Sequence, residues 1–174
     1  NATRREAFAH QMSERLQIDV RAVAHPEQAV NDVDILIAAT NTGAEGPALF
    51  GKWLYPGLHV SSIGSTIPTQ REIDAHVWRW ADRIVLDTHC VLQESGDALA
   101  ALAEGTLDDR KITELSAIVA GKSPGRTRPD ETTLYKSIGT GVQDVAVAFR
   151  IYERAHERGL GQELADYQSP KPAS

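Results

Sequence analysis

The chain has 174 residues, of which 41% are hydrophobic and 24% charged, and its formal net charge is −6. This composition is typical of a globular domain or of part of a larger globular protein, and the acidic balance disfavours a nucleic-acid partner. No apolar run reaches the roughly 20 residues of a membrane-spanning helix, so we expect no membrane partner. The single cysteine, Cys90, excludes an internal disulfide and favours a reducing, cytoplasmic compartment.

Hydrophobic periodicity divides the chain into helices and strands. In chain order we predict a helix over 2–16, a strand over 18–24, a short helix over 26–30, a strand over 33–39, a strand over 58–63, a helix over 75–81, a strand over 83–86, a helix over 88–102 interrupted at Ser95-Gly96, a helix over 114–120, a strand over 132–137 and a long amphipathic helix over 142–158. Short strands that alternate with helices indicate βαβ units. We therefore predict an α/β fold with a doubly wound parallel sheet.

Two of these elements carry a more specific expectation. Thr3 stands three residues before Glu6, which is the spacing of a capping box, so we expect Thr3 to cap the first helix. The segment 33–39 (VDILIAA) is an apolar run that contains β-branched residues and is interrupted only by Asp34. Such a run predicts a strand that is buried on both faces of a parallel sheet.

The stretch 57–74 is where we expect the chemistry. Its strand runs into a Gly64-Ser65-Thr66 turn, Pro68 then interrupts regular structure, and the segment 71–74 (REID) opens the next helix. In open α/β sheets, ligands sit outside the carboxyl ends of the strands, where such a turn lies. The turn is therefore a candidate for the edge of an active site.

Other kinds of site have less support. The dinucleotide fingerprint G-x-G-x-x-G is absent, and Gly139-Thr140-Gly141 fits better as a turn that enters a helix. The six histidines fall at no metal-ligand spacing, so we expect no metal, and no G-x-S-x-G elbow supports a nucleophilic serine. Arg4 and Arg5 could admit the 2′-phosphate of a dinucleotide, but a solvated first helical turn explains them equally well.

Five groups of residues stand in an order that resembles the ornithine cyclodeaminase/mu-crystallin family. They are 34–40 (DILIAAT), 57–60 (GLHV), 63–65 (IGS) with Pro68 and 71–74 (REID), 94–97 (ESGD), and 134–139 (LYKSIG) followed by 143–144 (QD). The resemblance extends from Asn1 to about Gly161. It rests on the order of the groups, because no single one of them is decisive.

The resemblance implies a Rossmann-type NAD(P) domain joined to a substrate-binding and dimerisation domain made from both ends of the chain. On that template, residues 1–131 form part of the NAD(P) domain, and residues 132–160 supply a strand and a helix that cross to the dimerisation domain of a homodimer. Residues 161–174 form a flexible tail. Asn1 then falls at the end of the second Rossmann strand, so we expect the Gly-rich loop and the substrate region to lie upstream. We also expect this chain alone to be inactive and to bind no dinucleotide detectably.

The same template assigns candidate cofactor-binding residues. Asn1, Thr3 and Arg4 would surround the adenosine ribose, and Arg4 or Arg5 would substitute for an arginine that the family's NADP-using members often have at the position of Ala2. NADP is therefore slightly favoured over NAD. The remaining candidates lie at predicted strand ends: Ala39, Thr40, Asn41, Gly64, Ser65, Lys136, Ser137 and Gly139. Of these, the last three would approach the nicotinamide and the substrate.

Thr66 separates two activities within the resemblance. The cyclodeaminase itself has an aspartate at this position, whose carboxylate can manage protons while ammonia leaves. A threonine hydroxyl does not ionise near neutral pH, and hydride chemistry belongs to the nicotinamide. We therefore expect an NAD(P)-dependent oxidoreductase that acts on the carbon–nitrogen centre of a small amino or imino acid, as an imino-acid (ketimine) reductase or an amino-acid dehydrogenase. The alternatives are an ornithine cyclodeaminase that uses NAD catalytically, and a non-enzymatic crystallin-like binding protein or inactive fragment.

Overall fold

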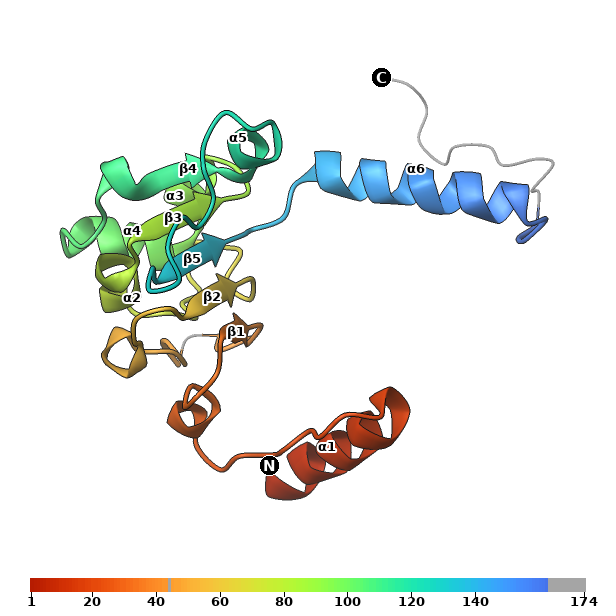
Figure 1. Cartoon of the computed structure of the whole chain (residues 1–174), viewed down its shortest axis with the longest axis horizontal. Helices are drawn as coiled ribbons and strands as arrows, with labels where there is room; N and C mark the ends of the chain where they lie inside the picture. The colour runs from red at the N-terminus through yellow and green to blue at the C-terminus, as the bar shows by residue number, and fades with distance from the viewer. Residues whose placement is uncertain (44, 163–174) are drawn as a thin grey trace. The chain divides into compact units, whose positions relative to one another are not determined.

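A parallel sheet forms the centre of the protein. The computed structural model describes residues 1–43 and 45–162, which divide into one compact unit from Asn1 to Gly139 and a second that begins at Thr140. The strands of the first unit are β1 (Ile35–Ala38), β2 (His59–Ser62), β3 (Arg83–Leu86), β4 (Ile112–Glu114) and β5 (Thr133–Lys136). They pair in the order β1-β2-β5-β3-β4, and every pair is parallel (Figure 1). The predicted parallel α/β sheet is confirmed.

Helices join and flank these strands. They are α1 (Ala2–Leu16), α2 (Ala75–Trp80), α3 (Val91–Glu94), α4 (Gly96–Ala103), α5 (Leu115–Val119) and α6 (Gly141–Glu157), with short 3₁₀ helices at Pro26–Ala29, Gly51–Trp53 and Asp109–Lys111. The predicted interruption at Ser95-Gly96 is confirmed as the boundary between α3 and α4. A methyl group on Gly96 would overlap the carbonyl oxygens of Pro68 and Gln70, so glycine lets the loop after β2 pass directly over this boundary.

Three local predictions differ from the structure. The segment 18–24 is not a strand, because the Ser13 hydroxyl accepts from the Val20 amide at 2.9 Å and ties the segment back to α1. Asn1, not Thr3, caps α1 by accepting from the Arg4 amide at 3.2 Å, since the helix already begins at Ala2. The strand β4 was not predicted at all, because its three residues are too few to show a periodicity.

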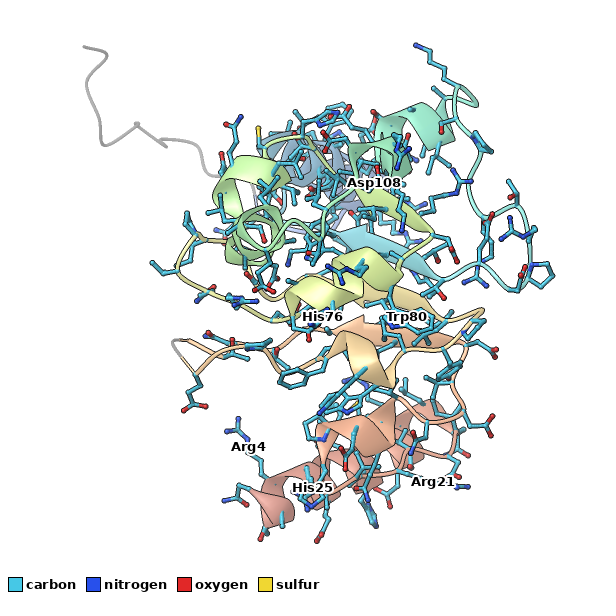
Figure 2. The ribbon with its side chains drawn as sticks, turned by 90° about the vertical axis from the view of Figure 1, so that its left-hand side faces the viewer. Arg4, Arg21, His25, His76, Trp80 and Asp108 are labelled. Carbon is cyan, nitrogen blue, oxygen red and sulfur yellow. The ribbon has the colours of Figure 1, made fainter. Side chains whose placement is uncertain are left out.

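The core lies on one face of the sheet. Alternate strand residues point to that face, where they pack with the buried side of α2 and with α4; the sheet's contribution to this cluster is Ala38, Val60, Ile84, Leu86 and Leu134. Helix α2 is positioned by the Asp74 side chain, which accepts from the amides of Val77 and Gly51. It buries Val77 and Trp78 while His76 and Trp80 project from its exposed side (Figure 2).

The first strand departs from the expected burial. Ile35 and Ile37 are each 64% exposed, whereas Ala38 is buried. The prediction that segment 33–39 is buried on both faces is therefore wrong. Ile35 and Ile37 share one face of β1, and their exposure shows that the described chain leaves this face largely uncovered at the sheet edge, where β1 has only β2 as a neighbouring strand.

The second unit contains the long helix α6, which confirms the helix predicted over 142–158. Thr140 caps it by accepting from the Gln143 amide. Its apolar side chains are exposed: Val142, Val145, Val147, Phe149, Ile151 and Tyr152. The sequence-based division placed the strand over 132–137 with this helix. In the structure β5 lies in the middle of the sheet, between β2 and β3, and the first unit continues to Gly139.

Candidate functional site

The carboxyl ends of β1, β2 and β5 meet at one edge of the sheet. Ala38, Ser62 and Lys136 are aligned across it, because Ala38 pairs with Ser62 and Ser62 with Lys136. Two loops leave this edge, one over 39–42 after β1 and one over 63–74 after β2. In a parallel sheet this is the edge where ligands bind.

Glu72 belongs to the second loop and is fully buried. Its carboxylate accepts four hydrogen bonds: from the Thr40 amide and hydroxyl (the latter at 2.9 Å) on one oxygen, and from the Ser62 hydroxyl (2.7 Å) and the Gly64 amide (2.9 Å) on the other. Burial alone would raise the pKa of Glu72, but the hydrogen bonds from Ser62, Gly64 and Thr40 outweigh it and lower that pKa. The carboxylate is therefore ionised, and it joins the ends of β1 and β2.

Lys136 and Asp97 form an ion pair next to this carboxylate. Both side chains are completely buried, and 2.9 Å separates Lys136 Nζ from Asp97 Oδ2. Lys136 Nζ also donates to the Ser62 hydroxyl at 3.1 Å and to the Ser65 carbonyl at 3.0 Å. Because Ser62 in turn donates to Glu72, the chain Asp97–Lys136–Ser62–Glu72 is one continuous polar network.

This ion pair holds the loop after β2 at both ends. Lys136 binds the Ser65 carbonyl at its beginning, and Asp97 Oδ1 accepts from the amides of Glu72 (2.7 Å) and Ile73 (3.1 Å) at its end. The Ser65 hydroxyl closes the loop by donating to the Gln70 carbonyl at 2.7 Å. The segment between these anchors, residues 66–69, is exposed. Thr66 is thus an exposed residue on a loop that is anchored at both ends.

The loops after β1 and β2 also contact each other closely. A methyl group on Gly64 would overlap both the Glu72 carboxylate and the Thr40 backbone, so only glycine allows this approach. The Thr42 hydroxyl donates to the Arg71 carbonyl at 2.5 Å, and the Gln70 side-chain amide donates to Asn41 Oδ1 at 3.4 Å. The two loops therefore form one structural unit.

Asp87 organises the turn after β5. It follows β3, and its Oδ2 accepts from the Ser137 hydroxyl (2.7 Å) and from the amides of Ile138 (3.1 Å) and Gly139 (2.9 Å). Gly139 has φ +80°, a conformation that favours glycine. Sequence reasoning did not single out Asp87, and it treated Glu72 and Asp97 only as parts of motifs. An acidic residue directly after a buried strand, as Asp87 is, was the available signal.

The structure brings most of the predicted site residues together at this edge. They differ in exposure and in the side chains that bind them. Ala39, Asn41 and Thr66 are exposed, whereas Ser65 is buried and Gly64 is partly buried. The Thr40 amide and hydroxyl are engaged by Glu72, and the Ser137 hydroxyl and Gly139 amide are engaged by Asp87. Lys136 is completely buried, so its ammonium contacts the network and not the surface.

The other candidates lie on α1. Asn1 is its N-cap, and Thr3 and Arg4 stand in its first turn, where Arg4 projects from the helix (Figure 2). Within residues 1–43 and 45–162, no hydrogen bond joins these three residues to the strand ends. Their predicted contact with an adenosine ribose stays a prediction.

The exposed edge carries no charged side chain of its own. The segments 39–42 (ATNT) and 63–70 (IGSTIPTQ) contain no ionisable side chain. In the network, Lys136 pairs with Asp97, and the Glu72 carboxylate is held by neutral donors. Among the described residues, no group of three or more His, Cys, Asp or Glu side chains is arranged to hold a metal ion. Such an edge can orient a neutral ring and a small substrate through backbone and hydroxyl groups, but it offers no acid or base of its own.

Comparisons with known proteins give a consistent result. The model of the ornithine cyclodeaminase/mu-crystallin family matches residues 1–159. A Delta(1)-pyrroline-2-carboxylate reductase of Bacillus cereus (strain ATCC 10987 / NRS 248) is 34% identical over 160 residues, which are 91% of this chain and 48% of that protein. The ketimine reductase mu-crystallin of Mus musculus is 33% identical over 153 residues, 88% of this chain and 45% of that protein.

A solved structure agrees with these matches. It is the Delta(1)-pyrroline-2-carboxylate reductase of Thermococcus litoralis in complex with NADH and L-proline, with 37% identity and a TM-score of 0.86 over 94% of this chain and 50% of that one. The chain thus spans about half the length of the relatives that it matches. Among the described residues, no helix is both long and apolar enough to cross a membrane.

Proposed function

The chain belongs to the ornithine cyclodeaminase/mu-crystallin family, and from this premise we propose that it supplies one wall of the active site of an NAD(P)-dependent imino-acid reductase. The observation that carries the proposal is the edge made by residues 39–42 and 63–70, which contains no ionisable side chain and is anchored by hydrogen bonds. It lies where parallel α/β sheets bind their ligands. The three relatives described above support the reductase reading, since all are named as reductases of cyclic imino acids or ketimines.

The residues of the edge fit a nicotinamide dinucleotide. Ala39 and Asn41 are exposed at the end of β1, and the close approach of Gly64 to Thr40 keeps the adjacent surface free of side-chain bulk. A reduced nicotinamide, when bound, supplies a hydride to the carbon of a carbon–nitrogen double bond. The part of this chain is to orient the reactants: residues 39–41 lie against the dinucleotide, and the anchored loop presents Thr66 to the substrate.

Thr66 distinguishes the reductase from an ammonia-eliminating lyase. A lyase needs a group that takes up and returns protons near the reacting carbon, which a carboxylate can do and a neutral hydroxyl cannot. The two carboxylates of the network, Glu72 and Asp97, are buried, and both accept hydrogen bonds within the fold. The loop therefore suits hydride transfer better than elimination.

Finer assignments extend the proposal. Arg4 and Arg5 at the start of α1 favour NADP over NAD, because a guanidinium can pair with a 2′-phosphate. The exposed apolar side chains of α6, including Val145 and Phe149, favour a homodimer in which this helix is covered. The substrate class is a small cyclic imino acid, and the single cysteine favours a cytoplasmic protein.

The decisive experiment measures net cofactor turnover by the complete natural polypeptide that carries these residues. With Delta(1)-pyrroline-2-carboxylate and NADPH or NADH, we expect stoichiometric loss of the reduced-nicotinamide absorbance. A cyclodeaminase would instead release ammonia from ornithine with no net change in that absorbance. Release of ammonia with Thr66 in place would contradict the proposal, and tighter binding of NAD than of NADP would contradict the cofactor preference.

A further inference from the structure

Glu72 joins the two loops of the candidate site, and we propose that it is a positioning residue that sets their spacing for the dinucleotide. The inference rests on the function proposed above. Glu72 is fully buried, so it does not touch a ligand. It acts through the two backbone segments that it holds, at Thr40 after β1 and at Gly64 after β2.

The donors that meet at Glu72 explain why a carboxylate is needed. Two of them are the backbone amides of Thr40 and Gly64, which cannot rotate, and each binds a different carboxylate oxygen. A carboxylate accepts at both oxygens, whereas the side chain of glutamine accepts at one and donates at the other. In Glu72→Gln, either orientation of the side-chain amide therefore places its NH₂ group against one of the two backbone amides.

The neighbouring ion pair fixes the direction of the remaining hydrogen bonds. Lys136 Nζ donates to the Ser62 oxygen, so the Ser62 hydroxyl proton is directed to Glu72. The hydroxyl cannot reverse to accommodate a donor at position 72 without leaving its own proton unpaired. Because of the Lys136–Asp97 pair, position 72 needs a side chain that only accepts hydrogen bonds, as an ionised carboxylate does.

The spacing that Glu72 controls is the one at which the loops touch. The Gly64 Cα lies so close to Thr40 and to the Glu72 carboxylate that no side chain fits between them. If Glu72 loses one of its two backbone partners, the end of β1 and the end of β2 can separate. The exposed residues on either side, Ala39 and Thr66, would then no longer be held in register.

Glu72→Gln tests the inference, with Asp74→Asn as the matched control. Both change an acid to its amide within the same segment, but Asp74 accepts from Gly51 and Val77 at the start of α2, away from the strand ends. In the chain itself, hydrogen exchange of the Thr40 and Gly64 amides is measured. We expect it to accelerate about 10- to 100-fold in Glu72→Gln, as for the loss of a buried hydrogen bond, and to stay unchanged in Asp74→Asn.

The second measurement uses the complete natural polypeptide. We expect the KM for the reduced dinucleotide to rise about tenfold in Glu72→Gln, with a much smaller change in kcat, and neither to change in Asp74→Asn. Unchanged exchange in Glu72→Gln overturns the inference, and so does accelerated exchange with an unchanged dinucleotide KM, which would make the role structural only. If the unsubstituted polypeptide oxidises no reduced dinucleotide, the proposed function fails instead, whatever the exchange result.

A milder variant keeps the test decisive if Glu72→Gln fails to fold. Ser62→Ala removes one of the four donors to Glu72 and leaves both backbone amides in place. We expect the same two effects at a smaller size. Effects in Ser62→Ala that match those of Asp74→Asn would contradict the inference.

Discussion

Lys136 and Asp97 form a completely buried ion pair in which Nζ and Oδ2 lie 2.9 Å apart. Apart from this ammonium, Asp97 Oδ2 has no hydrogen-bond partner among the described residues, so Lys136 compensates its charge. Together the two side chains anchor both ends of the loop that carries Thr66. The stability of the fold and the geometry of the candidate site therefore depend on the same pair.

We expect Lys136→Met to destabilise the chain by about 3–5 kcal/mol, because it leaves the Asp97 carboxylate buried without its partner. The free energy of unfolding from urea denaturation measures this loss. The double variant Lys136→Met with Asp97→Asn has no buried charge at the pair, and it should recover part of the stability. A double variant that is less stable than Lys136→Met would show that the uncompensated Asp97 carboxylate is not the cause of the destabilisation.

Gly64→Ala should destabilise the chain by about 1–3 kcal/mol, because its methyl group would force Thr40 and the Glu72 carboxylate apart. Gly125→Ala is the control, since a methyl group there meets only an ordinary contact with Ile118. Thermal denaturation compares the two variants. Equal melting temperatures would mean that the loops tolerate separation.

The lowered pKa of Glu131 predicts that the stability of the chain depends on pH. The Thr127 hydroxyl and amide both donate to its carboxylate, and these bonds lower its pKa from 4.5 to about 2. Because the pKa is lower in the folded state, the stabilisation is complete above pH 4.5 and is lost as the pH falls toward 2. Melting temperatures of the unsubstituted chain and Glu131→Gln should therefore differ near pH 6 and converge near pH 2. A difference that stays constant over this range would contradict the assignment.

Thr66→Asp tests the exposed loop. Thr66 is exposed and its loop is anchored elsewhere, so we expect the substitution to leave the melting temperature almost unchanged. In the complete natural polypeptide, a carboxylate at this position adds the proton-transfer group that the edge lacks. Reductase turnover and ammonia release from ornithine, measured before and after substitution, report the effect. We expect no ammonia from the unsubstituted protein, and ammonia released only by Thr66→Asp.

The exposed edge of β1 predicts self-association of the isolated chain. Ile35 and Ile37 present apolar side chains beside a strand edge that pairs with no further strand of the described residues, a combination that favours intermolecular pairing. Ile37→Lys should lower the average mass in sedimentation equilibrium. Val119→Lys is the control, because Val119 is also exposed but lies on α5. An equal effect of both substitutions would indicate general hydrophobic association.

Local sequence patterns determined most of the secondary structure. The spacing of apolar residues predicted α1 and α6, and short apolar runs predicted β1, β2, β3 and β5, because these signals depend only on near neighbours. The order of the motifs also led to the family and to the strand-end turn of Gly64 and Thr66. These features are encoded within segments of a few residues.

Only the tertiary structure decided which polar side chains are buried and which partners they have. Lys136 was a candidate for the nicotinamide, but it pairs with Asp97, and Glu72 collects donors from Thr40 and Gly64. Likewise, β1 was expected to be buried on both faces, but the face that carries Ile35 and Ile37 is left largely uncovered by the described chain. The sequence determined where strands and turns occur, whereas burial and partners arose when distant segments met. The physical reason is that a charge is buried only where a partner from elsewhere in the chain compensates it.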